Sequence, residues 1–424
     1  MKQFARIWVV SEVYYPDEQG GGHFMTKLAE GLASCHDVHV ICGYPYYRPG
    51  LKKPPASEVR NGVHIRRCYS TSFSKKHLVL RMFNFLTISL SLFVNALLRI
   101  GRDDLVIVVT TPPTLPFFVV TACRIVGAKC VLRIEDMYPG TLVATGVAKP
   151  AGTLVKVFSR INRYVHGNAD HITVIGRDMQ SMLTETAENA LEEDRVTMIP
   201  NWGELDLIKP QVKSENRLLG ELGLTDRFVV LCAGNMGRAQ AVENIVYAAE
   251  LLKKEGTIHF LFIGEGVKKD WMKEFARSRE LNNVTILDQR PRSDQANFLN
   301  SCDVAIVSLI SGMKGFAVPS RLYNIMAAGK PVIAMTAPDS EVSLVITEEN
   351  IGWVTPPDDP QGLADTVLEA FRRGASLESL GSRARAVVEK RYTYEQGIQK
   401  YCDVIENVAG SVNERFHLKD RTGQ

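Results

Sequence analysis

The sequence predicts an α/β protein built from two doubly wound units, and three observations support this. Short runs rich in valine and isoleucine alternate with amphipathic helices along the chain. Near-continuous apolar runs indicate strands that are covered on both faces, which is typical of a parallel sheet. The alternation breaks between Pro200 and Pro210, where Pro, Asn and Gly cluster, and then restarts. A chain of 424 residues is long for a single core, so we expect two domains that join near residue 205.

The first unit begins with a strand, a glycine loop and a helix whose apolar face carries Phe24, Leu28 and Leu32. The expected strands of this unit are residues 7–10, 38–41, 63–66, 105–109, 130–134 and 172–175. Those of the second unit are residues 228–231, 259–263, 284–287, 304–307, 332–334 and 353–354. A last amphipathic helix follows Tyr392.

The eight cysteines are scattered and form no Cys-x-x-Cys pair. This spacing argues against a zinc site or a disulfide framework and favours a reducing compartment. Several cysteines lie within apolar runs, so we expect most of them to be small core residues. The apolar run at residues 7–10 is too short for an export signal, and it reads as a buried strand.

The stretch from Arg48 to Arg102 holds eleven Lys or Arg and one acid, Glu58, although the whole chain has a net charge of only +3. Within it, residues 82–98 are uncharged and rich in Phe, Leu and Ile, but this run is shorter than the about 20 residues of a spanning helix. We expect a helix in the membrane interface, with the cations of residues 75–102 on anionic lipid. The alternative is a core helix between two strands. Nucleic acid is not an expected partner, because the basic residues surround an apolar helix.

Residues 315–334 contain the most informative run of the chain. Pro319 suits the first position of a helix and Gly329 its end, and a buried strand follows. Ser320 and Arg321 then lie at the helix start, where backbone N–H groups and a guanidinium favour a diphosphate. The alternative is an ordinary capped helix.

Several other loops follow predicted strands, at the sheet edge where open α/β sheets bind ligands. The triplet Gly20-Gly21-Gly22 either lets a ligand approach the backbone closely or forms a simple tight turn. A dinucleotide-binding fingerprint is not expected, because Met25 occupies the place of its third glycine and Cys42-Gly43, with no acid, ends the second strand. The adjacent Glu135 and Asp136 offer carboxylates for an acceptor hydroxyl, with His23 and His166 as possible partners, and one of the two carboxylates is expected to be structural.

Three of these segments resemble family 4 glycosyltransferases, and in particular the branch that builds bacterial surface polysaccharides. Residues 319–324, Pro-Ser-Arg-Leu-Tyr-Asn, resemble the Pro-Ser-Lys-Leu-Tyr-Glu run of that branch. Phe316 and Asn324 occupy the places of the family's two glutamates. Residues 233–240 resemble the donor-phosphate loop, with Asn235 and Gln240 in place of Arg and Lys. Residues 136–139 resemble the Asp-x-Trp-Pro motif, with Tyr138 for Trp.

The resemblance implies the GT-B fold, with two Rossmann-like domains that face each other across a cleft. Residues 1–205 plus 393–424 would form the acceptor-side domain, whose last helix crosses back to it, and residues 206–392 would form the nucleotide-sugar domain. The implied reaction is retaining transfer of a sugar from a UDP-sugar to a lipid-linked acceptor in surface polysaccharide or lipopolysaccharide biosynthesis. The sugar would be an N-acetylated hexosamine, as in N-acetylfucosamine transferases, and the enzyme would lie on the cytoplasmic face of the membrane. No cofactor and no metal are expected, because the chain has no Asp-x-Asp pair.

The resemblance also assigns roles to residues of this chain. The acceptor-side catalytic candidates are Asp136, Glu135 and His23. The donor-binding candidates are Gly21, Gly22, Asn235, Gly237, Arg238, Gln240, Gly264, Glu265, Arg290, Ser320, Arg321, Asn324 and Glu341. Arg238 could equally be a solvated surface residue, and Ser340 or Asp339 an ordinary cap. Two other functions stay open: a nucleotide-sugar 2-epimerase of the same fold, and a non-catalytic binding or scaffold protein, which the loss of both glutamates suggests.

Overall fold

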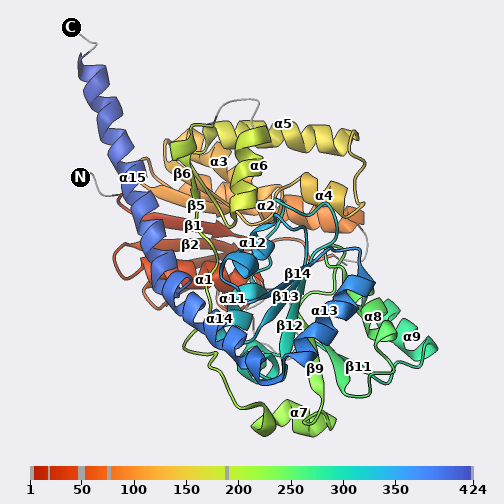
Figure 1. The fold of residues 1–424 in the computed structure, drawn as a ribbon. Coiled ribbons are helices and arrows are strands. Elements are labelled where there is room, and N and C mark those ends of the chain that lie inside the picture. Colours follow the sequence, from red (N-terminus) through yellow and green to blue (C-terminus); the bar gives the residue numbers. More distant parts are fainter. Residues whose placement is uncertain (1–3, 18–19, 46–52, 74–77, 187–190, 422–424) are drawn as a thin grey trace. The chain divides into compact units, whose positions relative to one another are not determined.

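Parallel strands of buried valine and isoleucine form the centre of each half of the chain (Figure 1). The computed structural model describes residues 4–17, 20–45, 53–73, 78–186 and 191–421. The predicted pair of doubly wound units is confirmed, because each half contains its own parallel sheet with helices between successive strands.

The chain divides into two compact units, neither of which is one continuous segment. The first unit comprises Met1–Pro139, Ala151–Pro200 and Gly397–Gln424, and the second comprises Gly140–Pro150 and Asn201–Gln396. Residues 140–150 therefore belong to the second unit, whereas the sequence placed them in the first. The reason is local packing: a Cβ at Gly140 would lie 2.1 Å from the ring of Phe316, so the chain is pressed onto that ring.

The first unit contains an eight-stranded sheet in the order β3-β4-β2-β1-β5-β6-β7-β8. All neighbours are parallel except β3 and β4. The strands are β1 (Ile7–Ser11), β2 (Val38–Gly43), β3 (Ser57–Arg60), β4 (Val63–Cys68), β5 (Leu105–Val109), β6 (Lys129–Ile134), β7 (His171–Val174) and β8 (Val196–Met198).

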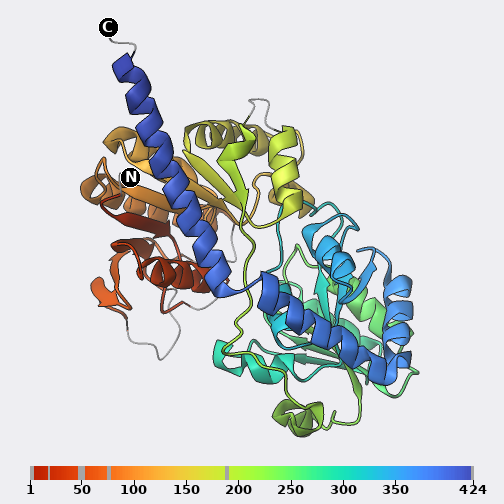
Figure 2. The same ribbon diagram turned by 60° about the vertical axis from the view of Figure 1, so that its left-hand side comes forward.

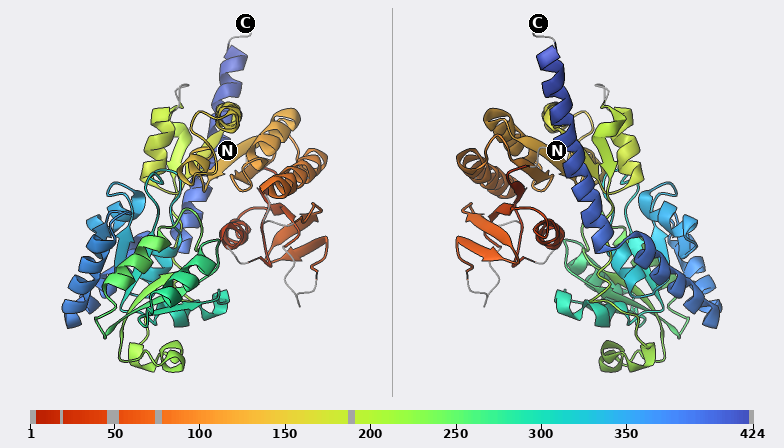
Figure 3. Two further views of the ribbon diagram at one scale, coloured as in Figure 1. Left: turned by 90° about the vertical axis from the view of Figure 1, so that its right-hand side faces the viewer. Right: turned by 90° about the vertical axis from the view of Figure 1, so that its left-hand side faces the viewer.

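Helices cover this sheet and connect its strands. They are α1 (Gly21–Leu32), α2 (Leu78–Arg99), α3 (Leu115–Val126), α5 (Thr153–Asn168), α6 (Arg177–Thr186), the short η1 (Glu193–Arg195) and most of α15 (Tyr394–Arg421). The helices α2 and α3, drawn in orange, lie side by side, and α2 also packs on β2 and β4 (Figure 3).

The last helix returns to the first unit (Figure 2). Its residues Tyr401, Val404, Ile405 and Val408 are buried and recur at three- and four-residue spacing, so they form one apolar face. The hydroxyl of Tyr401 accepts a hydrogen bond from Arg133 Nη1 on β6. This contact joins the end of the chain to the centre of the sheet.

The second unit contains a six-stranded parallel sheet in the order β11-β10-β9-β12-β13-β14. Its strands are β9 (Phe228–Ala233), β10 (Ile258–Ile263), β11 (Val284–Leu287), β12 (Val304–Ser308), β13 (Val332–Met335) and β14 (Gly352–Thr355). Its longer helices are α8 (Val242–Leu251), α9 (Lys269–Ser278), α12 (Glu341–Glu348), α13 (Pro360–Arg372) and α14 (Leu377–Arg391). The shorter ones are α4 (Gly140–Ala144), η2 (Lys213–Glu215), α7 (Arg217–Leu222), η3 (Arg292–Asp294), α10 (Gln295–Leu299), α11 (Arg321–Ala327) and η4 (Gly374–Ser376).

Candidate functional site

The loops that follow β9 and β10 touch each other at the carboxyl end of the second sheet. The N–H of Gly234 donates to Ile263 O at 2.8 Å, and the N–H of Met236 donates to Glu265 O at 2.8 Å. A Cβ at Gly264 would lie 1.8 Å from Gly234 O, so only glycine permits this approach. The predicted glycine positions thus shape a narrow double loop at the edge where open α/β sheets bind ligands.

Arg321 lies against this double loop. Its Nη1 donates to Ala233 O at 3.0 Å, and its Cζ would be 3.1 Å from a Cβ placed on Gly234. Burial lowers the pKa of the guanidinium, and Cys232 opposes that shift. Among the described residues no carboxylate forms a salt bridge with Arg321. A partly buried cation without an acidic partner is poised to hold an anion.

Two other predicted residues of the loop have distinct surroundings. The Gln240 Oε1 accepts from the N–H of Gly237 at 3.1 Å, so this side chain fixes the loop conformation. Arg238 and Asn235 are exposed. The Asn235 amide lies over Gly237, where a Cβ would come within 2.8 Å of Nδ2. Asn235 and Arg238 are therefore the two side chains of the loop that a solute reaches directly.

Glu265 and Arg290 already have ionic partners. Lys269 Nζ lies 2.6 Å from Glu265 Oε1 and 2.6 Å from Asp288 Oδ1. Arg290 Nε lies 2.7 Å from Asp294 Oδ2, while its Nη1 is buried without a hydrogen-bond partner among the described residues. These contacts hold the loops after β10 and β11 in place.

Asn324 makes a contact that its sequence position did not predict. Its side chain is only 4% exposed, and its Oδ1 accepts from the N–H of Glu204 at 3.0 Å. The residue therefore holds the segment that enters the second unit, because a backbone donor buried there needs an acceptor. Glu341 is also buried, in the first turn of α12, and Ser320 precedes α11 without capping it through its side chain. The donor-binding roles of Ser320, Asn324 and Glu341 stay predictions.

In the first unit the two neighbouring carboxylates are in different environments. Glu135 Oε1 lies 3.2 Å from Arg133 Nε, and its Oε2 would be 2.8 Å from a Cβ on Gly21. The first glycine of α1 thus makes room for the Glu135 carboxylate at the amino end of that helix, where negative charge is stabilised. A Cβ at Gly22 would lie 2.6 Å from Asp17 O. The glycine loop is therefore a close-packed turn around Glu135, which accounts for its composition without a ligand.

Asp136 lines a cavity of about 30 Å³. Burial, and then the charge of Glu135, raises the pKa of Asp136 to about 7. His166 lines the same cavity, and burial lowers its pKa to about 4, so its imidazole is neutral near pH 7. Burial also raises the pKa of Tyr138. A carboxyl group that titrates near neutrality beside a cavity is suited to proton transfer.

Sequence reasoning missed two side chains that position this cavity. Thr110 directly follows β5, and its Oγ1 accepts from the N–H groups of Glu135 at 3.1 Å and Asp136 at 3.3 Å. Asn162 on α5 lines the cavity and donates to Tyr138 O. The position of Thr110 directly after a predicted strand was a usable signal, whereas Asn162 lies within a helix and carried none. The predicted His23 is buried in α1 and meets the ring of Phe24 edge-on at 5.9 Å.

The helix α2 has one buried and one exposed apolar face. Ile88, Leu92 and Ala96 are buried, and Ser89 Oγ lies 2.8 Å from Thr114 Oγ1 of the neighbouring segment. The opposite face exposes large apolar side chains, with exposed fractions of 52% for Phe83 and 75% for Leu98. This exposed stripe consists of Val79, Met82, Phe83, Leu86, Leu90, Val94 and Leu98.

Within the described residues α2 is also the one helix that is long and apolar enough to cross a membrane. Val79–Arg99 has a mean hydropathy of 1.5 and 28% of the segment is buried, although core helices of soluble proteins can pass the same test. Within α2, Asn84 Oδ1 accepts from the N–H of Phe73 and Asn84 Nδ2 donates to Phe73 O. The predicted cations Lys75 and Lys76 lie outside the described residues.

Comparison with known proteins gives a consistent result for both halves of the chain. Residues 216–387 match the family described as "Glycosyl transferases group 1", and residues 19–202 match "Glycosyl transferase 4-like domain". The chain is 30% identical over 398 residues to the probable glycosyltransferase WbjE of Pseudomonas aeruginosa, with 94% of this chain and 96% of that protein covered. It is 24% identical over 413 residues to the putative colanic acid biosynthesis glycosyl transferase WcaI of Escherichia coli K12, covering 94% and 99%.

Among solved structures, HepE of Anabaena in complex with UDP-glucose superimposes with a TM-score of 0.70 at 16% identity, covering 95% of this chain and 99% of that chain. At this identity the likeness concerns the fold.

Proposed function

The chain belongs to the group 1 glycosyltransferases, which have the GT-B fold, and from that premise we propose that it transfers a sugar from a UDP-sugar to a lipid-linked acceptor. The observation that carries the donor half of this proposal is Arg321: a partly buried guanidinium beside a glycine loop, with no salt bridge to a carboxylate among the described residues. Its fork geometry suits the diphosphate of a nucleotide sugar.

The diphosphate leaving group is the centre of the proposed chemistry. Breaking the bond between sugar and diphosphate develops negative charge on the phosphate oxygens, and a positioned cation stabilises that charge most in a site shielded from water. Arg321 supplies the cation, and the backbone N–H groups of the loop after β9 lie next to it. The HepE complex contains UDP-glucose, which supports a uridine donor for this chain as well.

On the acceptor side, Asp136 is the proposed proton acceptor. Its pKa of about 7 leaves a useful fraction of carboxylate at neutral pH and keeps that carboxylate basic enough to attract the proton of a sugar hydroxyl. Glu135 has a structural role instead, since Arg133 and the start of α1 both hold its carboxylate. The small cavity beside Asp136 lies in the first unit, as expected for an acceptor-side group.

The finer features of the reaction extend the same proposal. A relative named for colanic acid biosynthesis supports a role in surface polysaccharide or lipopolysaccharide assembly, and hence a lipid-linked acceptor at the cytoplasmic membrane face. The exposed stripe of α2 fits such a location, because lipid would cover apolar side chains that water now contacts. We also propose retention of configuration, an N-acetylated hexosamine as the sugar and catalysis that needs no metal or cofactor.

The test of the donor site uses Arg321→Ala, with Arg217→Ala as the matched control. Loss of a charge-assisted contact to diphosphate should weaken UDP binding by about 2 kcal/mol, or roughly 30-fold, in calorimetric titration. Arg217 is exposed on α7, which precedes β9 and carries none of the predicted donor-site residues, so its removal should change UDP affinity by less than about threefold.

Unchanged UDP affinity in a folded Arg321→Ala variant would remove this residue from the donor site. Product analysis then separates the rival activities. Epimerised UDP-sugar formed without acceptor indicates an epimerase, and UDP binding without turnover on any lipid-linked acceptor indicates a binding protein. Either result contradicts the proposed transfer.

A further inference from the structure

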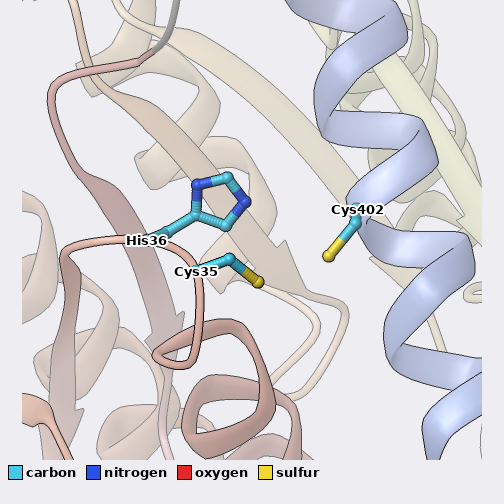
Figure 4. A group of neighbouring side chains, drawn as sticks. All are labelled: Cys35, His36 and Cys402. Atoms are coloured by element: carbon cyan, nitrogen blue, oxygen red, sulfur yellow. The ribbon is translucent and has the colours of Figure 1, made fainter.

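Three side chains with metal-binding groups, Cys35, His36 and Cys402, come together in the first unit (Figure 4). Cys35 and His36 lie in the turn that follows α1, and Cys402 projects toward them from α15. The two sulfur atoms and an imidazole nitrogen all lie within 4.8 Å of one another. Tetrahedral zinc requires ligand atoms at comparable separations, because each lies about 2.0 to 2.3 Å from the ion.

Both sides of this cluster are held by the fold. The N–H groups of Cys35 and His36 both donate to Leu32 O, at 3.2 and 3.0 Å, which winds the turn onto the end of α1. On the other side, Cys402 follows Tyr401, a fully buried residue whose hydroxyl contacts Arg133. The ligand groups are therefore brought together by the packing of α15 and need no metal to meet.

The chemistry of the group points to a soft metal. Two thiols and an imidazole are donors that zinc and similar ions favour over oxygen ligands. Glu406 lies one helical turn beyond Cys402, and its charge acts on His36, so a carboxylate is close to the fourth position. Of the eight free cysteines, Cys35 and Cys402 are the two that are not buried, so an ion can reach them from solvent.

A second group of metal-binding residues is less suitable. Asp37, His39 and His64 also approach within 4.8 Å of one another. Arg6 lies close enough to His39 for its positive charge to lower the pKa of that imidazole. The same charge would repel a bound cation, and this group contains no thiol.

We propose that Cys35, His36 and Cys402 bind one thiophilic divalent ion of the zinc type, which clamps α15 to the turn after α1. Binding releases one proton from each thiol, and the two thiolates balance the charge of the ion while His36 binds as a neutral ligand. The site lies in the first unit and uses none of the residues assigned above to sugar transfer. Its role is structural: it cross-links residues near the two ends of the chain.

Cobalt and zinc titrations of the full-length, reduced and metal-stripped protein test the proposal. We expect one Co²⁺ per chain, with a thiolate-to-cobalt charge-transfer band and the intense visible bands of tetrahedral coordination. Cys402→Ser and Cys35→Ser should abolish the charge-transfer band or weaken Zn²⁺ affinity by roughly 100-fold or more, because each removes a thiolate ligand. The matched control His64→Gln removes a ligand of the second group and should bind as the wild type does.

Thermal unfolding keeps the test decisive if a variant is less stable. Zn²⁺ should raise the Tm of the wild type and of His64→Gln, but not that of Cys402→Ser, whose own Tm without metal serves as the reference. The proposal is overturned if the reduced wild type gives no thiolate-to-cobalt band, or if Cys402→Ser binds the ion as tightly as the wild type and with an unchanged band. A Zn²⁺-induced rise in Tm that is lost in His64→Gln and kept in Cys402→Ser would assign the ion to the other group.

Discussion

Glu135 and Asp136 are consecutive in sequence, yet their surroundings give the two carboxyl groups different properties. Arg133 and the first turn of α1 hold Glu135 as a charged structural group. Asp136 lines a cavity, and burial raises its pKa to about 7. The sequence predicted that one of the two would be structural, but it could not say which one. Gly21 leaves space for the Glu135 carboxylate, whereas burial and the charge of Glu135 act on Asp136.

The Asp136→Asn variant should lose turnover and keep donor affinity. An amide cannot accept the proton of a sugar hydroxyl, so we expect kcat to fall by roughly 100-fold or more while UDP affinity stays within about twofold. In the wild type, kcat should rise with pH through about 7 as Asp136 ionises, and this rise should vanish in the variant. Steady-state kinetics from pH 5.5 to 8.5 measure both quantities. An equal loss of UDP affinity would place Asp136 on the donor side.

The same substitution has a pH signature in stability. Because the folded pKa of Asp136 lies above the unfolded value of 3.8, the folded state binds more protons between these two values. The wild type should therefore lose stability as pH rises from about 4 to 7, and this penalty should persist above pH 7. Asp136→Asn should relieve it, raising the free energy of unfolding at pH 8 by on the order of 4 kcal/mol relative to the effect at pH 4. Denaturant titration at the two pH values checks the sign.

At the scale of elements, α2 combines the two alternatives that its sequence left open. Its buried face packs on α3, β2 and β4, as in a core helix. Its other face exposes seven large apolar side chains at helical spacing, as in an interfacial helix. Composition alone could not separate the two faces, because residues 82–98 carry no charged side chain that would mark a solvent-facing side. Packing on α3, β2 and β4 buries one face of α2 and leaves the opposite face exposed.

This exposed stripe should bind anionic membranes. Wild-type protein should sediment with phosphatidylglycerol-containing liposomes at low salt, and the triple variant Phe83→Ser, Leu86→Ser, Leu90→Ser should partition at least about tenfold less, because it exposes less apolar surface to insert. The matched control replaces three exposed apolar residues of the second unit, Leu207, Val267 and Leu251, by Ser and should sediment normally. Equal sedimentation of the α2 variant and the wild type would contradict the membrane role.

Strands with continuous apolar runs were predicted from the sequence, whereas the short or polar edge strands of the first sheet were not. All six strands of the second sheet were predicted: the four central ones are largely buried apolar runs, and the edge strands β11 and β14 are half-buried but still contain neighbouring apolar residues. In the first sheet β3 and β8 were not predicted. Ser57–Arg60 is a polar, antiparallel edge strand, and Val196–Met198 has only three residues. Neither presents the continuous apolar run that marks a central parallel strand.

The candidate site was predictable where a backbone feature dictated the residue type. Gly264 and Arg321, two of the predicted donor-site residues, both lie against Gly234. Asn324 could not be assigned from its position, since its contact to Glu204 depends on how the linker enters the second unit. The spacing of the cysteines likewise gave no sign that Cys35 meets Cys402, because that contact exists only once the chain has folded back.

For the whole molecule, the return of α15 matters most to stability. Truncation after Gln396 removes Tyr401, Val404, Ile405 and Val408 from the core of the first unit and leaves Arg133 without the Tyr401 hydroxyl. At roughly 1.5 to 3 kcal/mol for each buried side chain, the loss is comparable to the stability of a whole domain. We expect the first unit of the truncated protein to be unfolded, and limited proteolysis should detect this as rapid cleavage within that unit. Truncation after Gly410 keeps all four residues, so the rate of proteolysis and the Tm should stay close to those of the wild type.

The discontinuity of the first unit also sets the order in which a ribosome can complete the two units. Residues 201–396 leave the ribosome before the segment that contains Tyr401, so every part of the second unit is available while the first still lacks its last helix. The usual order, in which the N-terminal domain finishes first, is therefore reversed in this chain. Until translation ends, the sheet synthesised earliest has an apolar surface uncovered where α15 will pack. Nascent chains stalled before residue 397 would therefore be the ones that chaperones bind at the N-terminal half.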